Sequence, residues 1–172
     1  MTSTPTQTPT GALALADGSV FLGHGTGATG TALGEVCFNT AMTGHQETLA
    51  DPSYAGQVVC FTFPHVGNVG ANAEDEEAAS DPARKAAVGM ISRAKITPPA
   101  SWRAEQTFEE WLCARGIVAL TRVDTRALTR KIREGGMQMC AIAHDAAGNI
   151  DIEALKAAAA GAPTMEGREL AA

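Results

Sequence analysis

Two neighbouring stretches hold most of the residues whose side chains could take part in chemistry. Residues 38–54 read FNTAMTGHQETLADPSY, and residues 62–72 read TFPHVGNVGAN. Both combine hydroxyl, amide and imidazole side chains with Gly and Pro, which occur where the backbone needs particular dihedral angles. Because both lie beside apolar runs that indicate strands, we interpret them as loops held in a defined shape. Such loops carry function more often than strands do.

The four cysteines are candidates for a nucleophile, because an exposed thiolate near positive charge is reactive. Their contexts are EVCFN, VVCFT, WLCAR and QMCAI. None of these has the glycines of a strand-to-helix nucleophile elbow, and all have apolar neighbours. We therefore interpret all four as structural thiols, buried in a protein of the reducing cytosol and not paired in disulfides. They are Cys37, Cys60, Cys113 and Cys140.

A metal site would need the histidines together with the cysteines. Zinc sites normally show local ligand pairs such as C-x-x-C, H-x-x-H or H-E-x-x-H, and the sequence contains none of these pairs. We therefore expect no metal at His24, His45, His65 or His144. His45 and His65 are expected to stabilise loops through hydrogen bonds of their ring nitrogens.

Acid–base chemistry would need a pair of carboxylates, and Glu47 and Asp51 lie four residues apart. Pro52 and the surrounding turn residues favour Asp51 as the start of a turn or a cap instead. Ser53 follows on the same turn. Its hydroxyl can bond either its own turn or the carboxylate or ammonium group of a substrate, and the residues alone leave both interpretations open.

A literal G-x-G-x-x-G occurs at Gly25, Gly27 and Gly30. In a dinucleotide-binding turn such glycines open a helix whose N-terminus meets the pyrophosphate. Here they run into Thr31-Ala32-Leu33-Gly34 and then a β-branched and aromatic run, so the required helix is missing. We favour a glycine-rich turn between strands, with phosphate binding as the weaker alternative.

Composition indicates a globular protein of one domain. The chain has 172 residues, of which 45% are hydrophobic and 19% charged, enough for one core but short for two domains. Its net charge of -6 argues against a nucleic-acid platform. One basic cluster, Arg122–Arg133, is interleaved with apolar positions at helical spacing, which indicates the solvated or partner-facing side of a helix. No apolar run is long enough to cross a membrane, and residues 1–11 are expected to be a disordered tail and not a secretory signal.

The elements that must position these residues are predicted from periodicity, turn residues and caps. Asp17-Gly18 predicts a hairpin over residues 12–22, and Thr107 with Glu110 predicts a reciprocally capped helix. A strand-rich first half followed by three later helices predicts an α/β fold of layered β/β/α type. Further strands are expected at 36–38, 57–63, 88–96, 117–120 and 137–143, and helices from Pro82, at 107–115, at 124–134 and at 152–160. Either Asp124 or Thr125 is expected to cap the helix at 124–134, and either Asn149 or Asp151 the helix at 152–160.

These motifs together resemble the amino-terminal domain of the small, glutamine-hydrolysing subunit of carbamoyl phosphate synthetase. The two stretches above lie in register with LADGSVFLG and GATG before them. The acidic DEE at 75–77, the segment GIVALTRVDTRALTRKIREGG and the closing MEGRELA also match. The resemblance covers residues 12–172 and implies a single swivelling-type β/β/α domain over that range.

The resemblance implies a role inside a larger enzyme, a cytoplasmic ligase of pyrimidine and arginine biosynthesis. In that family a separate carboxy-terminal amidotransferase domain hydrolyses glutamine, and the large subunit turns the ammonia into carbamoyl phosphate. This chain lacks that glutaminase half, so this span alone is expected to be inactive and to hold no catalytic residue. It is expected to dock on the large subunit as part of a heterodimer.

For the site, the resemblance implies that Ser53 binds L-glutamine across the domain boundary, because the family's D-P-S-Y turn matches residues 51–54. No cofactor is expected in this span, and ATP, magnesium and potassium are expected in the partner large subunit. No contact with nucleic acid or membrane is expected. Two alternatives stay open: a stand-alone interaction module without catalytic activity, and an independent small-molecule enzyme built on the loops from Gly44 to Gly70.

Overall fold

The computed structural model describes residues 8–72, 86–102 and 104–164, which contain seven strands, four α-helices and one 3-10 helix, η1. The strands are β1 (Gly11–Leu15), β2 (Val20–Gly27), β3 (Gly30–Asn39), β4 (Gln57–Phe61), β5 (Gly89–Ile91), β6 (Val118–Thr121) and β7 (Met139–His144). The helices are α1 (His45–Ala50), η1 (Pro52–Tyr54), α2 (Phe108–Ala114), α3 (Thr125–Gly135) and α4 (Ile152–Gly161).

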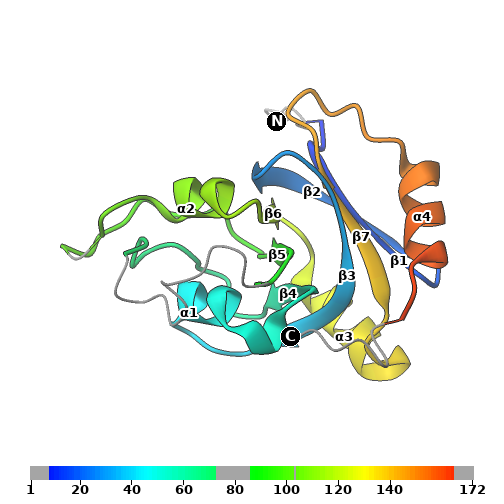
Figure 1. Ribbon diagram of the computed structural model, residues 1–172, viewed down its shortest axis with the longest axis horizontal. Coiled ribbons are helices and arrows are strands. Elements are labelled where there is room, and N and C mark those ends of the chain that lie inside the picture. Colours follow the sequence, from blue (N-terminus) through cyan, green and yellow to red (C-terminus); the bar gives the residue numbers. More distant parts are fainter. Residues whose placement is uncertain (1–7, 73–85, 103, 165–172) are drawn as a thin grey trace, which may run out of the picture.

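The strands form one closed barrel in the order β1-β2-β6-β5-β4-β3-β7 (Figure 1). Strands β3, β4, β5 and β6 run parallel to one another, whereas β1, β2 and β7 pair antiparallel with their neighbours. Closure removes the unpaired edges that an open sheet would expose. The mixed α/β class and the strand-rich first half are confirmed, but the layered swivelling arrangement is not confirmed, because the strands belong to a single barrel.

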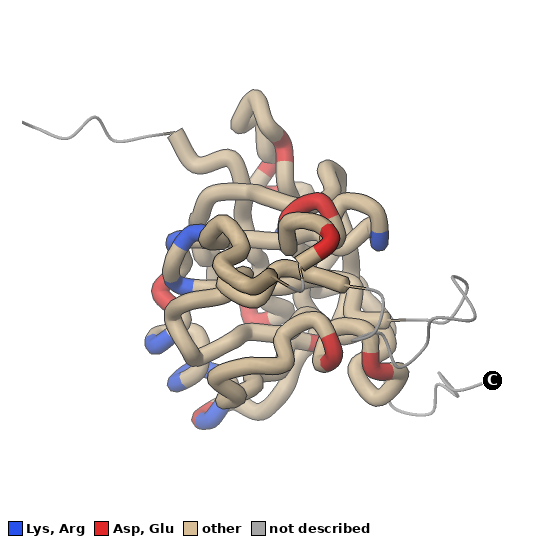
Figure 2. Tube along the Cα trace, turned by 90° about the vertical axis from the view of Figure 1, so that its left-hand side faces the viewer, with Lys and Arg blue, Asp and Glu red and all other residues tan. Residues whose placement is uncertain are grey.

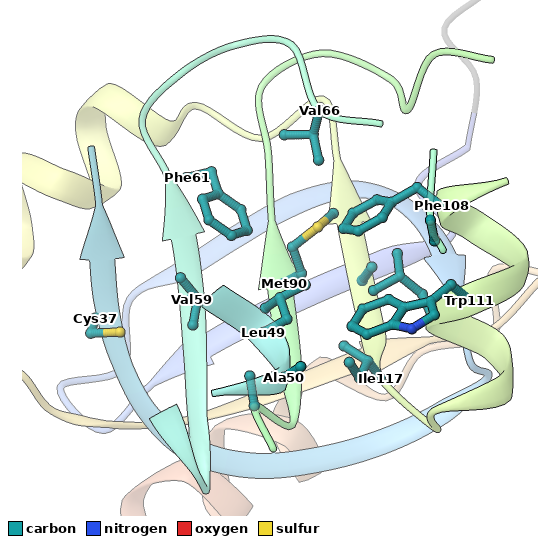
Figure 3. Packing of buried hydrophobic residues seen from close by; sticks show 14 residues of the cluster. Cys37, Leu49, Ala50, Val59, Phe61, Val66, Met90, Phe108, Trp111 and Ile117 are labelled. Carbon is teal, nitrogen blue, oxygen red and sulfur yellow. The ribbon is translucent and has the colours of Figure 1, made fainter. Parts of the chain in front are cut away.

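Alternation along the strands produces three separate cores, because successive side chains point to opposite faces. Inside the barrel, Val58 and Cys60 of β4 pack with residues of β1, β6 and β7 and with Leu128 and Ile132 of α3, which closes one end. On the outer face, Val59 and Phe61 of β4 pack beneath α1 and α2 (Figure 3). Strand β4 is therefore covered on both faces, as its apolar run predicted.

The third core lies on the opposite side of the barrel, where α4 covers β1 and β7 (Figure 1). The buried strand residues of this core are all alanines, Ala12, Ala14 and Ala141 among them, and they pack with Leu155 and Ala159 of the helix. Because alanine side chains are small, the helix can approach the sheet closely. The small size of these residues therefore matters to this core as well as their hydrophobicity.

Local turn and cap signals were predicted well. The Asp17-Gly18 hairpin is present, with Leu13 opposite Phe21 and Gly18 at φ 87. Thr107 and Glu110 form the reciprocal capping box of α2, while Asp124 and Asp151 cap α3 and α4 through Ala127 N and Ala154 N. Each of these signals lies within a few residues of the element that it controls, so the sequence pattern was enough.

Other predictions need correction. Residues 43–50 were interpreted as loop, yet His45–Ala50 form the short helix α1. The strand predicted at 88–96 is only Gly89–Ile91, because Ser92 and the residues after it leave the sheet. The glycine-rich turn favoured at Gly25, Gly27 and Gly30 does join strands but is shorter than predicted, because Gly25 and Gly27 lie in β2 and Gly30 begins β3. Gly27 and Gly30, at the two ends of the turn, have positive φ.

Several predictions concern residues outside the described part of the chain. They are the helix from Pro82, the DEE motif at 75–77 and the closing MEGRELA. Residues 1–7 of the expected tail also lie outside it. Of the remainder, Thr10 accepts a hydrogen bond from Asp145 N at 3.0 Å, and Gly11 begins β1. The predicted boundaries of the domain stay predictions.

Candidate functional site

The turn at residues 51–54 is held by its own backbone. Asp51 N–H donates to Glu47 O at 2.9 Å and so ends α1, and the Asp51 carboxylate accepts from Ser53 N at 2.8 Å. Pro52 occupies the first position of η1. Asp51 is therefore a cap and turn residue, as interpreted from the sequence, and not half of an acid–base pair.

Ser53 is exposed on this turn. Its backbone is restrained by Asp51, but its hydroxyl makes no hydrogen bond to any residue in the described part of the chain. The hydroxyl is thus available to a group from outside this turn. The neighbouring Tyr54 anchors the turn to the end of β3, where Asn39 Nδ2 donates to the Tyr54 hydroxyl at 3.0 Å.

The two sequence stretches, 38–54 and 62–72, are joined by one pair of buried amides. Gln46 Nε2 donates to Asn72 O at 2.6 Å, and Asn72 N donates to Gln46 Oε1 at 3.0 Å. Both residues are only 4% exposed, so neither backbone group of Asn72 could find water if Gln46 were lost. This pairing was not predicted from the sequence, although both residues lie in the stretches that it singled out.

Beside this pair is a cavity of about 200 Å³, which we call the signature cavity because residues of both stretches line it. Its walls come from the start of α1, from the loop after β4, and from Phe108 of α2. The lining residues are Thr43, Gly44, His45, Gln46, Glu47, Gly67, Val69, Gly70 and Phe108.

His45 forms one wall of the signature cavity and is largely enclosed. Its ring lies edge-on to Phe61, with 4.7 Å between ring centroids. Burial lowers the pKa of His45 and outweighs a backbone hydrogen bond at Ala41 that raises it, so the ring is neutral at pH 7. The Nε2 atom is buried and has no partner among the described residues. The prediction of loop-stabilising hydrogen bonds therefore holds at one ring nitrogen of His45 only.

His65 does not repeat this arrangement. It is exposed, and its ring contacts Phe63, with centroids 6.2 Å apart. Among the described residues it makes a ring contact and not the hydrogen bonds that were predicted.

Two glycines keep the loop after β4 close to its neighbours. Gly67 and Gly70 have φ 97 and 73, values that L side chains rarely adopt. A Cβ on Gly67 would lie 2.6 Å from Ile96 Cγ2, and one on Gly70 would lie 2.6 Å from Ala104 Cβ. Both glycines are thus required by conformation and by space.

The thiols are not arranged for nucleophilic attack. Cys37, Cys60 and Cys140 are buried, whereas Cys113 is exposed, which corrects the prediction that all four are buried. Burial raises the pKa of Cys37 and of Cys60 to about 12, and it raises those of Cys140 and Cys113 as well. All four stay protonated at neutral pH, and none is in a disulfide.

The two remaining histidines, His24 and His144, each lie beside a polar group. His24 lies near the hydroxyl of Thr10 at 3.3 Å, and His144 Nδ1 lies 3.2 Å from the carbonyl of Ala28. No group of three or more His, Cys, Asp or Glu within the described residues could hold a metal ion. In the same part of the chain, no helix is long and apolar enough to cross a membrane.

Comparison with known proteins assigns most of the barrel to one family. Residues 13–142 match the model of the carbamoyl-phosphate synthase small chain, CPSase domain. The carbamoyl phosphate synthase small chain of Maricaulis maris (strain MCS10) is 93% identical over 172 residues, which are all of this chain and 44% of that protein. That of Rhizobium meliloti (strain 1021) is 57% identical over 99% of this chain and 43% of its own length.

The chain therefore spans less than half the length of the curated relatives that it matches. Among solved structures, an aminopeptidase from Aneurinibacillus sp. strain AM-1 aligns over 83% of this chain and 31% of its own, with 15% identity and a TM-score of 0.42. That likeness is too weak to bear on function. The family model and the relatives agree, and the chain belongs to the carbamoyl phosphate synthase small chain family, within its CPSase domain.

Proposed function

We propose that this domain serves a glutamine-dependent carbamoyl phosphate synthase of the cytoplasm by docking the small chain on the large chain and by completing the glutamine site with Ser53. The observation that carries the proposal is the match to the family's domain over residues 13–142, with the D-P-S-Y turn inside it. The relatives named above are all small chains of this synthase. The alternative of a stand-alone interaction module receives no support from them.

The geometry of the turn suits a binding role for Ser53. The backbone of Ser53 is restrained by Asp51 and Pro52, so the exposed hydroxyl loses little further freedom on meeting a ligand. A hydroxyl can donate to the carboxylate of glutamine or accept from its ammonium group. The side chain therefore combines availability with a defined position.

The bond-breaking step of glutamine hydrolysis belongs, in this proposal, to the family's amidotransferase domain. A thiolate nucleophile needs a lowered pKa and access to substrate, and the pKa of each of the four thiols here is raised. We expect this span alone not to hydrolyse glutamine. We also expect it to need no cofactor, with ATP, magnesium and potassium bound by the large chain.

Docking would use exposed side chains of the types that dominate interface energies, namely aromatic residues, Met and Arg. Trp102 is 92% exposed and Met42 is 67% exposed, so both side chains are available to a partner, and aromatic residues and Met are enriched at interfaces. Loss of either should weaken association with the large chain. In a pull-down of the large chain, equal recovery with wild type, Trp102→Ala and Met42→Ala would contradict this docking surface.

Ser53→Ala in the full-length small chain, assembled with its large chain, tests the site. We expect kcat/KM for glutamine to fall by about tenfold, as for loss of one hydrogen bond to a charged group, while activity with added ammonia stays unchanged. Ser19→Ala is the matched control, because Ser19 N–H donates to Asp17 Oδ1 at 2.9 Å in a similar turn. Identical glutamine kinetics for wild type and Ser53→Ala would remove Ser53 from the site.

A further inference from the structure

A groove of about 550 Å³ lies at the carboxyl ends of the four parallel strands. Thr40 directly follows β3, Thr62 directly follows β4, and Arg93 lies two residues after β5. The helix α3, which comes after β6, supplies the remaining wall beyond Pro64. In parallel α/β sheets this edge is where loops and helix N-termini converge on ligands. The full lining is Thr40, Thr62, Pro64, Arg93, Thr125, Arg126, Thr129, Arg130 and Arg133, and we call it the arginine groove.

The charge of the arginine groove has one sign. Four of its nine lining residues are arginines and none is acidic, although the whole chain carries a net charge of -6. Arg93, Arg126 and Arg130 form no ion pair with any residue in the described ranges. The carboxylate next along the chain, Asp124, is engaged at 3.0 Å with Ala127 N as the helix cap. In Figure 2 most of the Lys and Arg lie on the left-hand side of the molecule, with a few Asp and Glu among them.

A buried hydroxyl strengthens the case for a ligand. Thr129 is 9% exposed, lines the groove, and its Oγ1 has no nitrogen or oxygen partner among the described residues. Its side chain makes a hydrogen bond with the thiol of Cys60 in the barrel core, and a thiol is a weak hydrogen-bonding group. Buried hydroxyls are normally satisfied, so a ligand oxygen in the groove would complete this one.

The walls are arranged as one cationic helix face. Thr125, Thr129 and Arg133 repeat every four residues along α3, and Arg126 and Arg130 form the adjoining row, so all five lie on neighbouring turns of one face. The Arg133 guanidinium lies 5.3 Å from the Phe38 ring centroid, which restricts its orientation. The positive end of the helix dipole adds to the same field.

We propose that the arginine groove binds the phosphate group of a small molecule. Guanidinium groups pair with phosphate oxygens through two parallel hydrogen bonds, and the threonine hydroxyls can donate to the remaining oxygens. A volume of 550 Å³ is larger than a phosphate ion alone requires, so it also leaves room for an organic group. This site is separate from the Ser53 turn and does not depend on the proposed role in glutamine binding.

Calorimetric titration tests the proposal. The chain is titrated with inorganic phosphate, pyrophosphate and adenosine monophosphate, and adenosine is the control that lacks phosphate. We expect saturable, salt-sensitive binding of at least one phosphate probe and none of adenosine. Preference for adenosine monophosphate over both inorganic probes would identify an organic phosphate as the ligand, and the reverse order would identify a free phosphate. Absence of saturable binding with all three phosphates would overturn the proposal.

Variants on one helix separate a built site from diffuse attraction. We expect Arg126→Ala and Arg130→Ala each to weaken binding about tenfold, and Thr129→Val to weaken it several-fold. Lys131→Ala is the matched control, because it removes the same charge from α3 while Lys131 pairs with Asp17 at 2.9 Å and lies outside the groove lining. Equal weakening by Lys131→Ala, or binding of a hepta-glutamate peptide that phosphate does not displace, would contradict a phosphate site.

Discussion

The signature cavity and the arginine groove are built partly from the same two loops, yet they treat polar groups in opposite ways. The loop after β3 gives Thr43 to the cavity and Thr40 to the groove, and the loop after β4 gives Gly67 to the cavity and Thr62 to the groove. In the cavity, Gln46 and the backbone of Asn72 satisfy each other, and only His45 Nε2 is a buried side-chain atom without a partner among the described lining residues. In the groove, exposed guanidinium groups lack a carboxylate among the lining residues.

The amide groups of the cavity therefore stabilise the loops, whereas the guanidinium groups of the groove are available to bind a ligand. The hydrogen bonds of the buried amide pair stabilise the folded chain. The clustered arginines instead repel one another, and this repulsion destabilises the folded chain until an anion binds. Substitutions at the cavity should therefore lower stability, and substitutions at the groove should change binding and leave stability intact.

The largest effect is expected at Phe108, which lines the cavity and is 1% exposed against Trp111, with ring centroids 5.6 Å apart. Phe108→Ala should lower the free energy of unfolding by about 3–5 kcal/mol, because it removes a buried ring and leaves a void. Urea unfolding measures this loss. Met42→Ala, at an exposed position of the same region, is the control and should cost less than about 0.5 kcal/mol.

If Phe108→Ala lowered the free energy of unfolding by less than about 1 kcal/mol, the outer core would not support the cavity. It would also remove the distinction drawn between the two regions.

A smaller loss is expected at the amide pair. Gln46→Ala should cost about 2–4 kcal/mol, because it removes two hydrogen bonds to the buried backbone of Asn72. Gln57→Ala is the control, since Gln57 donates to Glu35 at 3.3 Å in a partly buried position. Equal costs in urea unfolding would show that water replaces Gln46 and that the pair does not hold the two stretches together.

Local signals in the sequence predicted the caps and the hairpin, but not how distant segments meet. Helix α1 was missed because six residues from His45 to Ala50 are too few for a helical period to be recognised. Closure of the barrel was missed because β1 pairs with β7 and β2 with β6, contacts between residues about a hundred positions apart. No local pattern records such pairings.

The candidate sites divide in the same way. The D-P-S-Y turn is a local motif, so the role of Asp51 was predicted correctly and Ser53 was singled out. The arginine groove needs Arg93 beside α3, which only the parallel strand order brings about. The basic cluster Arg122–Arg133 was interpreted from its spacing as the solvated or partner-facing side of a helix, and it supplies Arg126, Arg130 and Arg133 to the groove.

A pH titration sharpens the comparison through His45. Because burial lowers the pKa of His45 in the folded chain, the unfolded chain binds the proton more tightly. Stability should therefore be complete above the ordinary histidine pKa of about 6.5 and fall as the solution is acidified below it. His45→Phe should flatten this decline in urea unfolding between pH 7 and pH 5, leaving the part due to His24, whose pKa burial also lowers. An unchanged slope would show that His45 reaches water.

The smallest effect on stability is expected in the groove itself. Arg130 is exposed, has no ion pair in the described part of the chain, and lines the groove together with three other arginines. Arg130→Ala should therefore change the free energy of unfolding by less than about 0.5 kcal/mol, and relief of like-charge repulsion should make the change stabilising at low salt. Urea unfolding at low and high salt measures this, with Lys131→Ala as the control that breaks an ion pair. A clear loss of stability from Arg130→Ala at both salt concentrations would mean that the groove arginines hold the fold, and the contrast with the signature cavity would fail.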